Sequence, residues 1–120
     1  MSINENNELL SKLQKCSERL AVDMPIRKVI LFGSYVWGDI NKESDIDLLV
    51  IGERKDRNIR TEIAMEFHHA IPDKPMDVLL KTNNEINDRV IMGDSFIRKI
   101  ITEGKILYGK DEGDRERVAG

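Results

Sequence analysis

The short connection between Ser34 and Asp45 is the feature that most constrains the fold. Two apolar runs flank it, RKVILF over residues 27–32 and DIDLLVI over residues 45–51. Short apolar runs of this kind, bounded by turn residues, predict buried strands. The ten residues 35–44 between them are too few for a parallel crossover, which needs about a dozen or more. We therefore expect the two strands to pair antiparallel.

This pairing places several polar residues at one corner of the sheet. The end of the first strand, Gly33 and Ser34, should meet the start of the second, where Asp45 and Asp47 leave the same strand face. A third apolar run, MDVLL, follows after a segment that contains a predicted helix. That segment is long enough for a right-handed crossover to a parallel strand. We therefore expect Asp77, near the start of MDVLL, at the same corner.

Helical periodicity recurs in the segments between and after these strands. Apolar residues at helical spacing predict helices over residues 7–22, 58–71, 83–92 and 94–103. Asn83 or Asn84 is expected to cap the third of these helices and Asp94 the fourth. A short helical turn is expected at 34–38 and an edge strand at 106–108. The chain is thus predicted to be an α/β (α+β) domain with a small mixed sheet of three or four strands and flanking helices.

The chain length and charge restrict the classes of function. The 120 residues suffice for one domain: a helix packing on the core (1–25), the core itself (26–108) and a disordered tail (109–120).

The net charge is −3, so the basic excess typical of nucleic-acid binding is missing and no direct nucleic-acid binding is expected. No run is apolar enough for a membrane span, and no signal peptide is evident. With a single cysteine, Cys16, a reducing, cytoplasmic location is expected.

The predicted corner has the chemistry of a site for a metal and a phosphate. Two like charges 4 Å apart repel by about 4 kcal/mol at an effective dielectric constant near 20, so three converging carboxylates favour a bound cation. Oxygen ligands suit Mg²⁺ or Mn²⁺, and two such ions can serve an in-line displacement at phosphorus. Gly33 lets the backbone approach a phosphate closely, and the following N–H groups and the Ser34 hydroxyl can donate to it.

These residues resemble a known signature. Gly33-Ser34, ten residues and Asp45-Ile46-Asp47, within LFGSYVWG and SDIDLLV and followed by MDVLL, are similar to the motif of the DNA-polymerase-β-like nucleotidyltransferase superfamily. The chain resembles most the minimal nucleotidyltransferases, short proteins often encoded beside a HEPN-domain partner. The resemblance covers roughly residues 26–108, which it identifies as a nucleotidyltransferase core.

The resemblance implies a role for each motif residue. Asp45 and Asp47 would hold two Mg²⁺ ions, and Asp77 would hold one of them and help to deprotonate the acceptor hydroxyl. Gly33 and Ser34 would grip the triphosphate of ATP. In HEPN and minimal-nucleotidyltransferase pairs, the enzyme is the antitoxin and adenylylates a tyrosine of the HEPN toxin. A hetero-oligomer with such a toxin is therefore expected.

One departure from the family pattern concerns the charge beside the triphosphate. Related sequences often carry an arginine a few residues after the Gly-Ser pair, whereas this chain has Tyr35, Val36 and Trp37 there. Lys42 or another base, together with the metal ions, would have to meet the phosphate charge. For Trp37, packing against a helical layer and stacking on a nucleotide base are both open.

Two other functions fit the same residues. One is a subunit of an aminoglycoside-type nucleotidyltransferase that modifies a small molecule. The other is an antitoxin that acts by binding alone, with catalytically idle acids. A stable complex without AMP transfer would favour the binding protein, and transfer to an aminoglycoside would favour the small-molecule enzyme.

Overall fold

The computed structural model describes residues 3–38 and 45–109. Along the chain, the elements are α1 (Ile3–Asp23), β1 (Ile26–Phe32), α2 (Ser34–Trp37), β2 (Ile46–Gly52), α3 (Arg57–Ala70), β3 (Met76–Thr82), α4 (Asn83–Ile91), α5 (Ser95–Glu103) and β4 (Lys105–Tyr108). Helices and strands thus follow one another in the predicted order. The first helix begins at Ile3, earlier than the predicted Asn7.

The four strands form one mixed sheet in the order β3-β2-β1-β4. β1 pairs antiparallel with β2, as the short connection between them requires, and also antiparallel with β4. β2 pairs parallel with β3 after the crossover through α3. The predicted strand directions and the predicted fold class, a small mixed sheet with flanking helices, are therefore confirmed.

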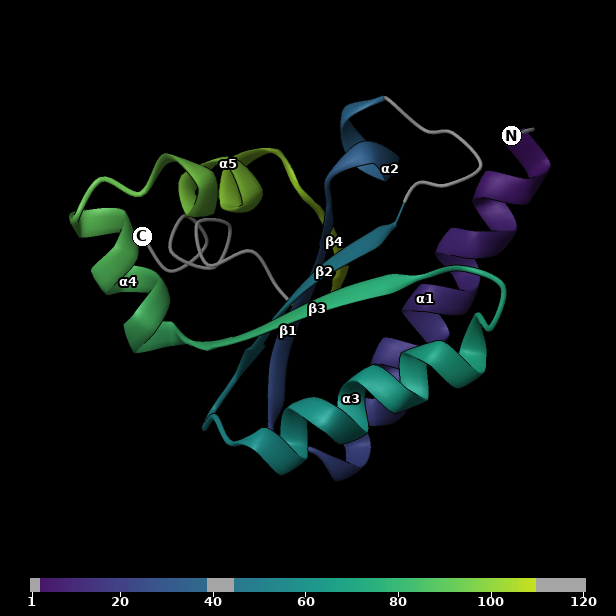
Figure 1. Ribbon diagram of the computed structural model, residues 1–120, viewed down its shortest axis with the longest axis horizontal. Helices are drawn as coiled ribbons and strands as arrows, with labels where there is room; N and C mark the ends of the chain where they lie inside the picture. Colours follow the sequence, from purple (N-terminus) through teal and green to yellow (C-terminus); the bar gives the residue numbers. More distant parts are fainter. Residues whose placement is uncertain (1–2, 39–44, 110–120) are drawn as a thin grey trace, which may run out of the picture.

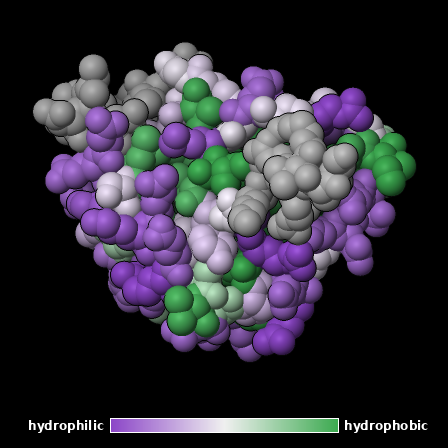
Figure 2. Space-filling view, turned by 180° about the vertical axis from the view of Figure 1, so that it is seen from behind, coloured by the Kyte–Doolittle hydropathy of each residue, from purple (hydrophilic) through white to green (hydrophobic). Residues whose placement is uncertain are grey.

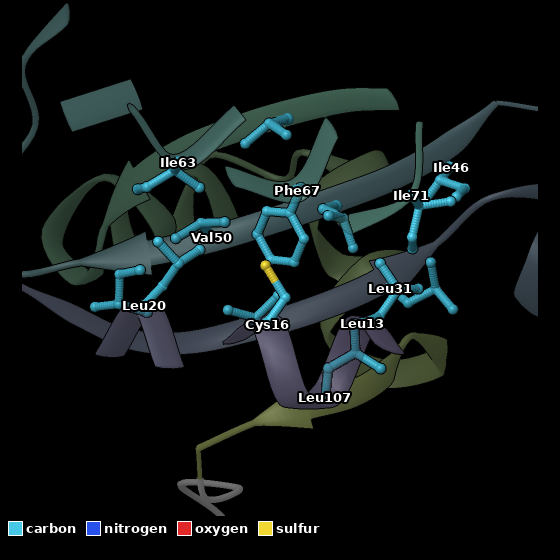
Figure 3. Close-up of a cluster of buried hydrophobic side chains, with 14 of the residues drawn as sticks. Leu13, Cys16, Leu20, Leu31, Ile46, Val50, Ile63, Phe67, Ile71 and Leu107 are labelled. Carbon is cyan, nitrogen blue, oxygen red and sulfur yellow. The ribbon is translucent and has the colours of Figure 1, made fainter. Parts of the chain in front are cut away.

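Side chains of the two central strands alternate between two hydrophobic clusters, one on each face of the sheet. On β1, Val29 and Leu31 face one cluster, whereas Ile30 and Phe32 face the other. The helices α1 and α3 cover the first face, and α4 and α5 cover the second (Figure 1). Figure 3 shows the first cluster, where the Phe67 ring of α3 lies beside Cys16 of α1.

The start of α4 differs from the prediction. Thr82, rather than Asn83 or Asn84, is the N-cap, and its hydroxyl accepts a hydrogen bond from the Glu85 N–H at 3.2 Å. The Glu85 carboxylate accepts in return from the Thr82 N–H at 3.0 Å. Such a reciprocal capping box satisfies two N–H groups, which explains why it prevails over a lone asparagine cap. The predicted cap of α5 is confirmed, because Asp94 accepts from the N–H groups of Phe96 and Ile97.

The capping box makes the stability of the fold depend on pH. Partial burial alone would raise the pKa of Glu85, but the hydrogen bond from Thr82 and the hydrogen bond and charge of Lys55 lower it below 4.5. A lowered folded-state pKa adds stability above the unfolded-state pKa, and this stability is lost as the pH falls through the folded-state pKa. We expect Glu85→Gln to be destabilised at pH 7 and the difference from the wild type to shrink below pH 4. Urea unfolding of both proteins across this pH range would measure it, and a constant difference would contradict the expectation.

Cys16 has a structural position. It is 1% exposed within the first cluster, and burial raises the pKa of its thiol despite the nearby charge of Arg19. Because the thiolate is the reactive form, we expect iodoacetamide to modify Cys16 slowly in the folded protein and rapidly in urea. The rate, followed by intact mass, should rise with the unfolded fraction across a urea titration. Fast labelling without denaturant would contradict a buried core thiol.

The outer surface is mainly hydrophilic. Seen from behind, apolar residues appear as separate areas among hydrophilic ones (Figure 2). The large apolar side chains that are exposed are Val22, Met65, Ile91, Met92, Phe96 and Ile101. Among the residues that the structure describes, no helix combines the length and the apolar character that crossing a membrane requires.

Candidate active site

Three strands bring the predicted site residues to one end of the sheet. In the antiparallel pair, Phe32 at the end of β1 lies opposite Asp47 of β2. In the parallel pair, Asp47 lies beside Asp77 of β3. Asp45 directly precedes the first residue of β2, and Gly33 directly follows Phe32. The strand registers alone therefore place the acids and the Gly-Ser turn at a shared corner.

The alternation of side chains also assigns the acids to one face of the sheet. On β2, Leu48 faces the cluster beneath α1 and α3, whereas Leu49 faces the cluster beneath α4 and α5. Asp47 is two residues before Leu49 and so shares its face. On β3, Asp77 shares a face with Leu79, which packs against the same second cluster. Both carboxylates thus belong to the side of the sheet that α5 covers.

Gly33 is in direct contact with Asp47. A Cβ atom built at Gly33 would overlap Oδ2 of Asp47 and lie 3.1 Å from its Cγ. Gly33 also has φ 81° and ψ −150°, a conformation essentially restricted to glycine. Both the space and the backbone conformation therefore require glycine here, and the Asp47 carboxylate lies against its backbone.

The turn after Gly33 is short and closed by backbone hydrogen bonds. The Gly33 carbonyl accepts from the N–H groups of Val36 and Trp37, and the Gly38 N–H donates to the Ser34 carbonyl. Ser34 itself is half-buried at the start of α2. This turn places Ser34 directly after Gly33, the residue that contacts Asp47.

The electrostatics of the corner are acidic. Partial burial and the charges of Asp77 and Asp45 raise the pKa of Asp47 above 3.8. The carboxylates of Asp77 and Asp45 are thus close enough to act on that of Asp47. No three His, Cys, Asp or Glu side chains within the described ranges form a ready-made set of metal ligands. Oxygen-only donors with mutual repulsion fit a hard cation such as Mg²⁺, since a cation would offset the repulsion that raises this pKa.

The sequence analysis also named Lys42 and Trp37 near the Gly-Ser turn. Lys42 falls within residues 39–44, which the structure does not describe. Trp37 packs against the second cluster, as the packing interpretation predicted, with its ring centroid 6.3 Å from that of Phe32.

The sequence analysis missed one residue near the turn. Lys99 of α5 has its Nζ 4.1 Å from the centroid of the Trp37 ring. The two residues are far apart in the sequence, and only the packing of α5 on the sheet brings them together. The apolar stripe of α5 predicts the helix. Nothing in the sequence indicates that Lys99 contacts Trp37.

Comparison with known proteins gives results that agree with this geometry. Residues 14–113 match the family described as "Polymerase beta, Nucleotidyltransferase". A protein of Methanocaldococcus jannaschii named "Putative protein adenylyltransferase" is 36% identical over 91 residues. That alignment covers 69% of this chain and 79% of the relative.

Solved structures with the same fold include chains from toxin–antitoxin complexes. A chain in a crystal structure of a toxin–antitoxin complex with AMP-PNP has a TM-score of 0.61 and 26% identity. The match covers 88% of this chain and 80% of that one. A chain from a complex of a tri-AMPylated Shewanella oneidensis HEPN toxin with its MNT antitoxin has a TM-score of 0.56 at 22% identity, covering 90% and 78%. Because the identity to this second chain is only 22%, the likeness shows the fold alone.

Proposed function

Because this chain belongs to the polymerase β nucleotidyltransferase family, we propose that it is a metal-dependent adenylyltransferase that transfers AMP from ATP to a hydroxyl of a partner protein. One observation carries the proposal most: the carboxylate of Asp47 lies against Gly33 and in register with Asp77. An acidic corner and a glycine turn suited to phosphate thus adjoin, which supports nucleotidyl transfer.

In the proposed reaction, each motif residue has a distinct task. Gly33 allows the triphosphate to approach the backbone, and the Ser34 hydroxyl donates to a phosphate oxygen. Asp45, Asp47 and Asp77 would hold two Mg²⁺ ions, or Mn²⁺. When bound, these ions neutralise phosphate charge and stabilise the attacking and leaving oxygens.

The transfer itself is a substitution at the α-phosphorus. The acceptor oxygen forms a bond to this phosphorus as the bond to the pyrophosphate oxygen breaks. Asp77 accepts the proton that the acceptor hydroxyl loses, which makes the oxygen a better nucleophile. The products are the adenylylated acceptor and pyrophosphate.

For the acceptor, we propose a tyrosine of a HEPN-domain toxin, so that this chain acts as a cytoplasmic antitoxin in a hetero-oligomer with the toxin. The M. jannaschii relative is named for protein adenylylation, and a similar chain occurs in a toxin–antitoxin complex with an ATP analogue. The resemblance to minimal nucleotidyltransferases supports a HEPN-domain protein as the partner. A protein acceptor also distinguishes this proposal from a small-molecule enzyme.

The test is to incubate the protein with Mg-ATP and its co-encoded HEPN partner and to measure the intact mass of the partner. Asp45→Asn serves as the matched inactive variant, with complex formation followed by size-exclusion chromatography. A gain of one or more AMP units with the wild type alone is expected. A stable complex without any gain would contradict the proposal and favour an antitoxin that acts by binding. Transfer to aminoglycosides but not to the partner would favour the small-molecule enzyme.

A further inference from the structure

The corner that would receive the triphosphate has acidic groups and no base on its own turn. The charges that act on Asp47 come from Asp45 and Asp77. The turn that follows Gly33 reads Ser-Tyr-Val-Trp-Gly, which contains no cationic side chain. A triphosphate carries several negative charges, so its binding beside these residues calls for a cation from another part of the fold.

Aromatic side chains connect the end of β1 to α2 and α5. The ring of Phe32, the last residue of β1, lies 6.3 Å from the Trp37 ring of α2. It also lies 5.6 Å from the Phe96 ring of α5 in an edge-to-face arrangement. Residues three apart on a helix share a face, so Lys99 lies on the same side of α5 as Phe96. Figure 1 shows α5 and α2 near the same end of β1.

Lys99 is held beside this end of the sheet by an aromatic contact. Its Nζ is 4.1 Å from the centroid of the Trp37 ring, a cation–π contact. Within the described ranges, the ion pairs are Arg19–Glu66, Lys55–Glu85 and Arg89–Asp94, so no carboxylate neutralises Lys99 there. Lys99 is exposed, and cation–π contacts at exposed sites are weak compared with charge-assisted bonds to phosphate. Among the residues that the structure describes, no carboxylate thus keeps its ammonium group from an anion.

From these contacts, we propose that Lys99 supplies the cation that binds the triphosphate of ATP beside the Gly33-Ser34 turn. Trp37 positions the Lys99 side chain over α2, on the sheet face that also carries Asp47 and Asp77. The turn itself carries no base, so this cation comes from α5, a helix far from the turn in the sequence. This inference rests on the proposed function, because it assigns part of its substrate site.

The single tryptophan of the chain makes the contact measurable without turnover. Trp37 is the only tryptophan, so its fluorescence reports on the group that stacks on it. We expect Mg-tripolyphosphate to change the Trp37 emission of the wild type as Lys99 moves to the ligand. Lys99→Met should need about tenfold more tripolyphosphate for half of this change, because it loses one charge-assisted bond. Lys99→Arg should keep most of the affinity, since an arginine also stacks on an aromatic ring.

Two variants serve as controls for charge. Arg98→Met removes the neighbouring positive charge, whose guanidinium group donates to the Val90 carbonyl, and is expected to bind tripolyphosphate like the wild type. Lys42→Met tests the other base named from the sequence. Equal losses in Arg98→Met and Lys99→Met, or a loss in Lys42→Met alone, would overturn the assignment of Lys99.

Calorimetric titration with Mg-ATP and with AMP completes the test. A weaker affinity of Lys99→Met for Mg-ATP, with unchanged affinity for AMP, is expected because AMP lacks the β- and γ-phosphates. Equal Mg-ATP affinities of the wild type and Lys99→Met would overturn the inference and leave the proposed function intact. If the wild type bound no nucleotide at all, the proposed function itself would fail.

Discussion

Asp47→Asn is expected to lower the rate of AMP transfer about a thousandfold, because the loss of a metal-binding carboxylate removes several kcal/mol of stabilisation of the transition state. The folded protein should be at least as stable as the wild type. Burial and the charges of Asp77 and Asp45 raise the pKa of Asp47, which means that the charged form is disfavoured in the fold. An amide of the same size removes that repulsion and keeps the shape.

Activity and stability should therefore change in opposite directions. Transfer would be measured by the mass of the acceptor, and stability by thermal unfolding without divalent ions. Asp88→Asn, which changes an exposed residue of α4, is the matched control. It should alter neither the activity nor the stability appreciably. An Asp47→Asn protein that kept wild-type activity, or one that lost activity only because it unfolded, would contradict the role assigned to Asp47.

Gly33→Ala is expected to lower the free energy of unfolding by about 1–3 kcal/mol, because its backbone conformation is essentially restricted to glycine. Its new Cβ would also overlap Oδ2 of Asp47 and displace the carboxylate. A displacement of about 1 Å at a reacting centre can cost a hundredfold in rate, so transfer should fall at least about that much.

Gly38→Ala separates strain from displacement. Gly38 also has a positive φ, 99°, but a Cβ there would meet no atom within 4 Å. This variant should lose about 1 kcal/mol of stability while retaining most of its activity. Urea unfolding and transfer assays of both variants would measure the difference. Equal losses of activity in the two variants would contradict a specific contact between Gly33 and Asp47.

The sheet could be predicted from the sequence because local chain lengths decide its strand directions. The connection after Ser34 is too short for a crossover, whereas the one before Asp77 has room for α3, and the observed antiparallel and parallel pairs follow from these lengths. The two pairings together place Asp47 beside Asp77. The position of the candidate site was therefore accessible from spacing alone.

Two features were missed, a local helix cap and a contact that depends on packing between distant elements. The capping box of α4 was missed because β3 continues to Thr82, beyond the apolar run from which its length was predicted. The contact between Lys99 and Trp37 depends on how α5 packs on the sheet. Lys99 does not stand out by its local pattern. The base proposed for the triphosphate could therefore be found only from the fold.

The central claim, that the corner of Gly33, Asp47 and Asp77 transfers AMP, is tested most directly by the position of a phosphorus label. The protein and its HEPN partner would be incubated with Mg-ATP labelled at the α-phosphate or at the γ-phosphate. Adenylyl transfer predicts that the partner gains label from α-labelled ATP alone, whereas the γ-label leaves in pyrophosphate, and that Asp47→Asn abolishes the labelling. Label from the γ-phosphate, or no label from either form, would contradict the account.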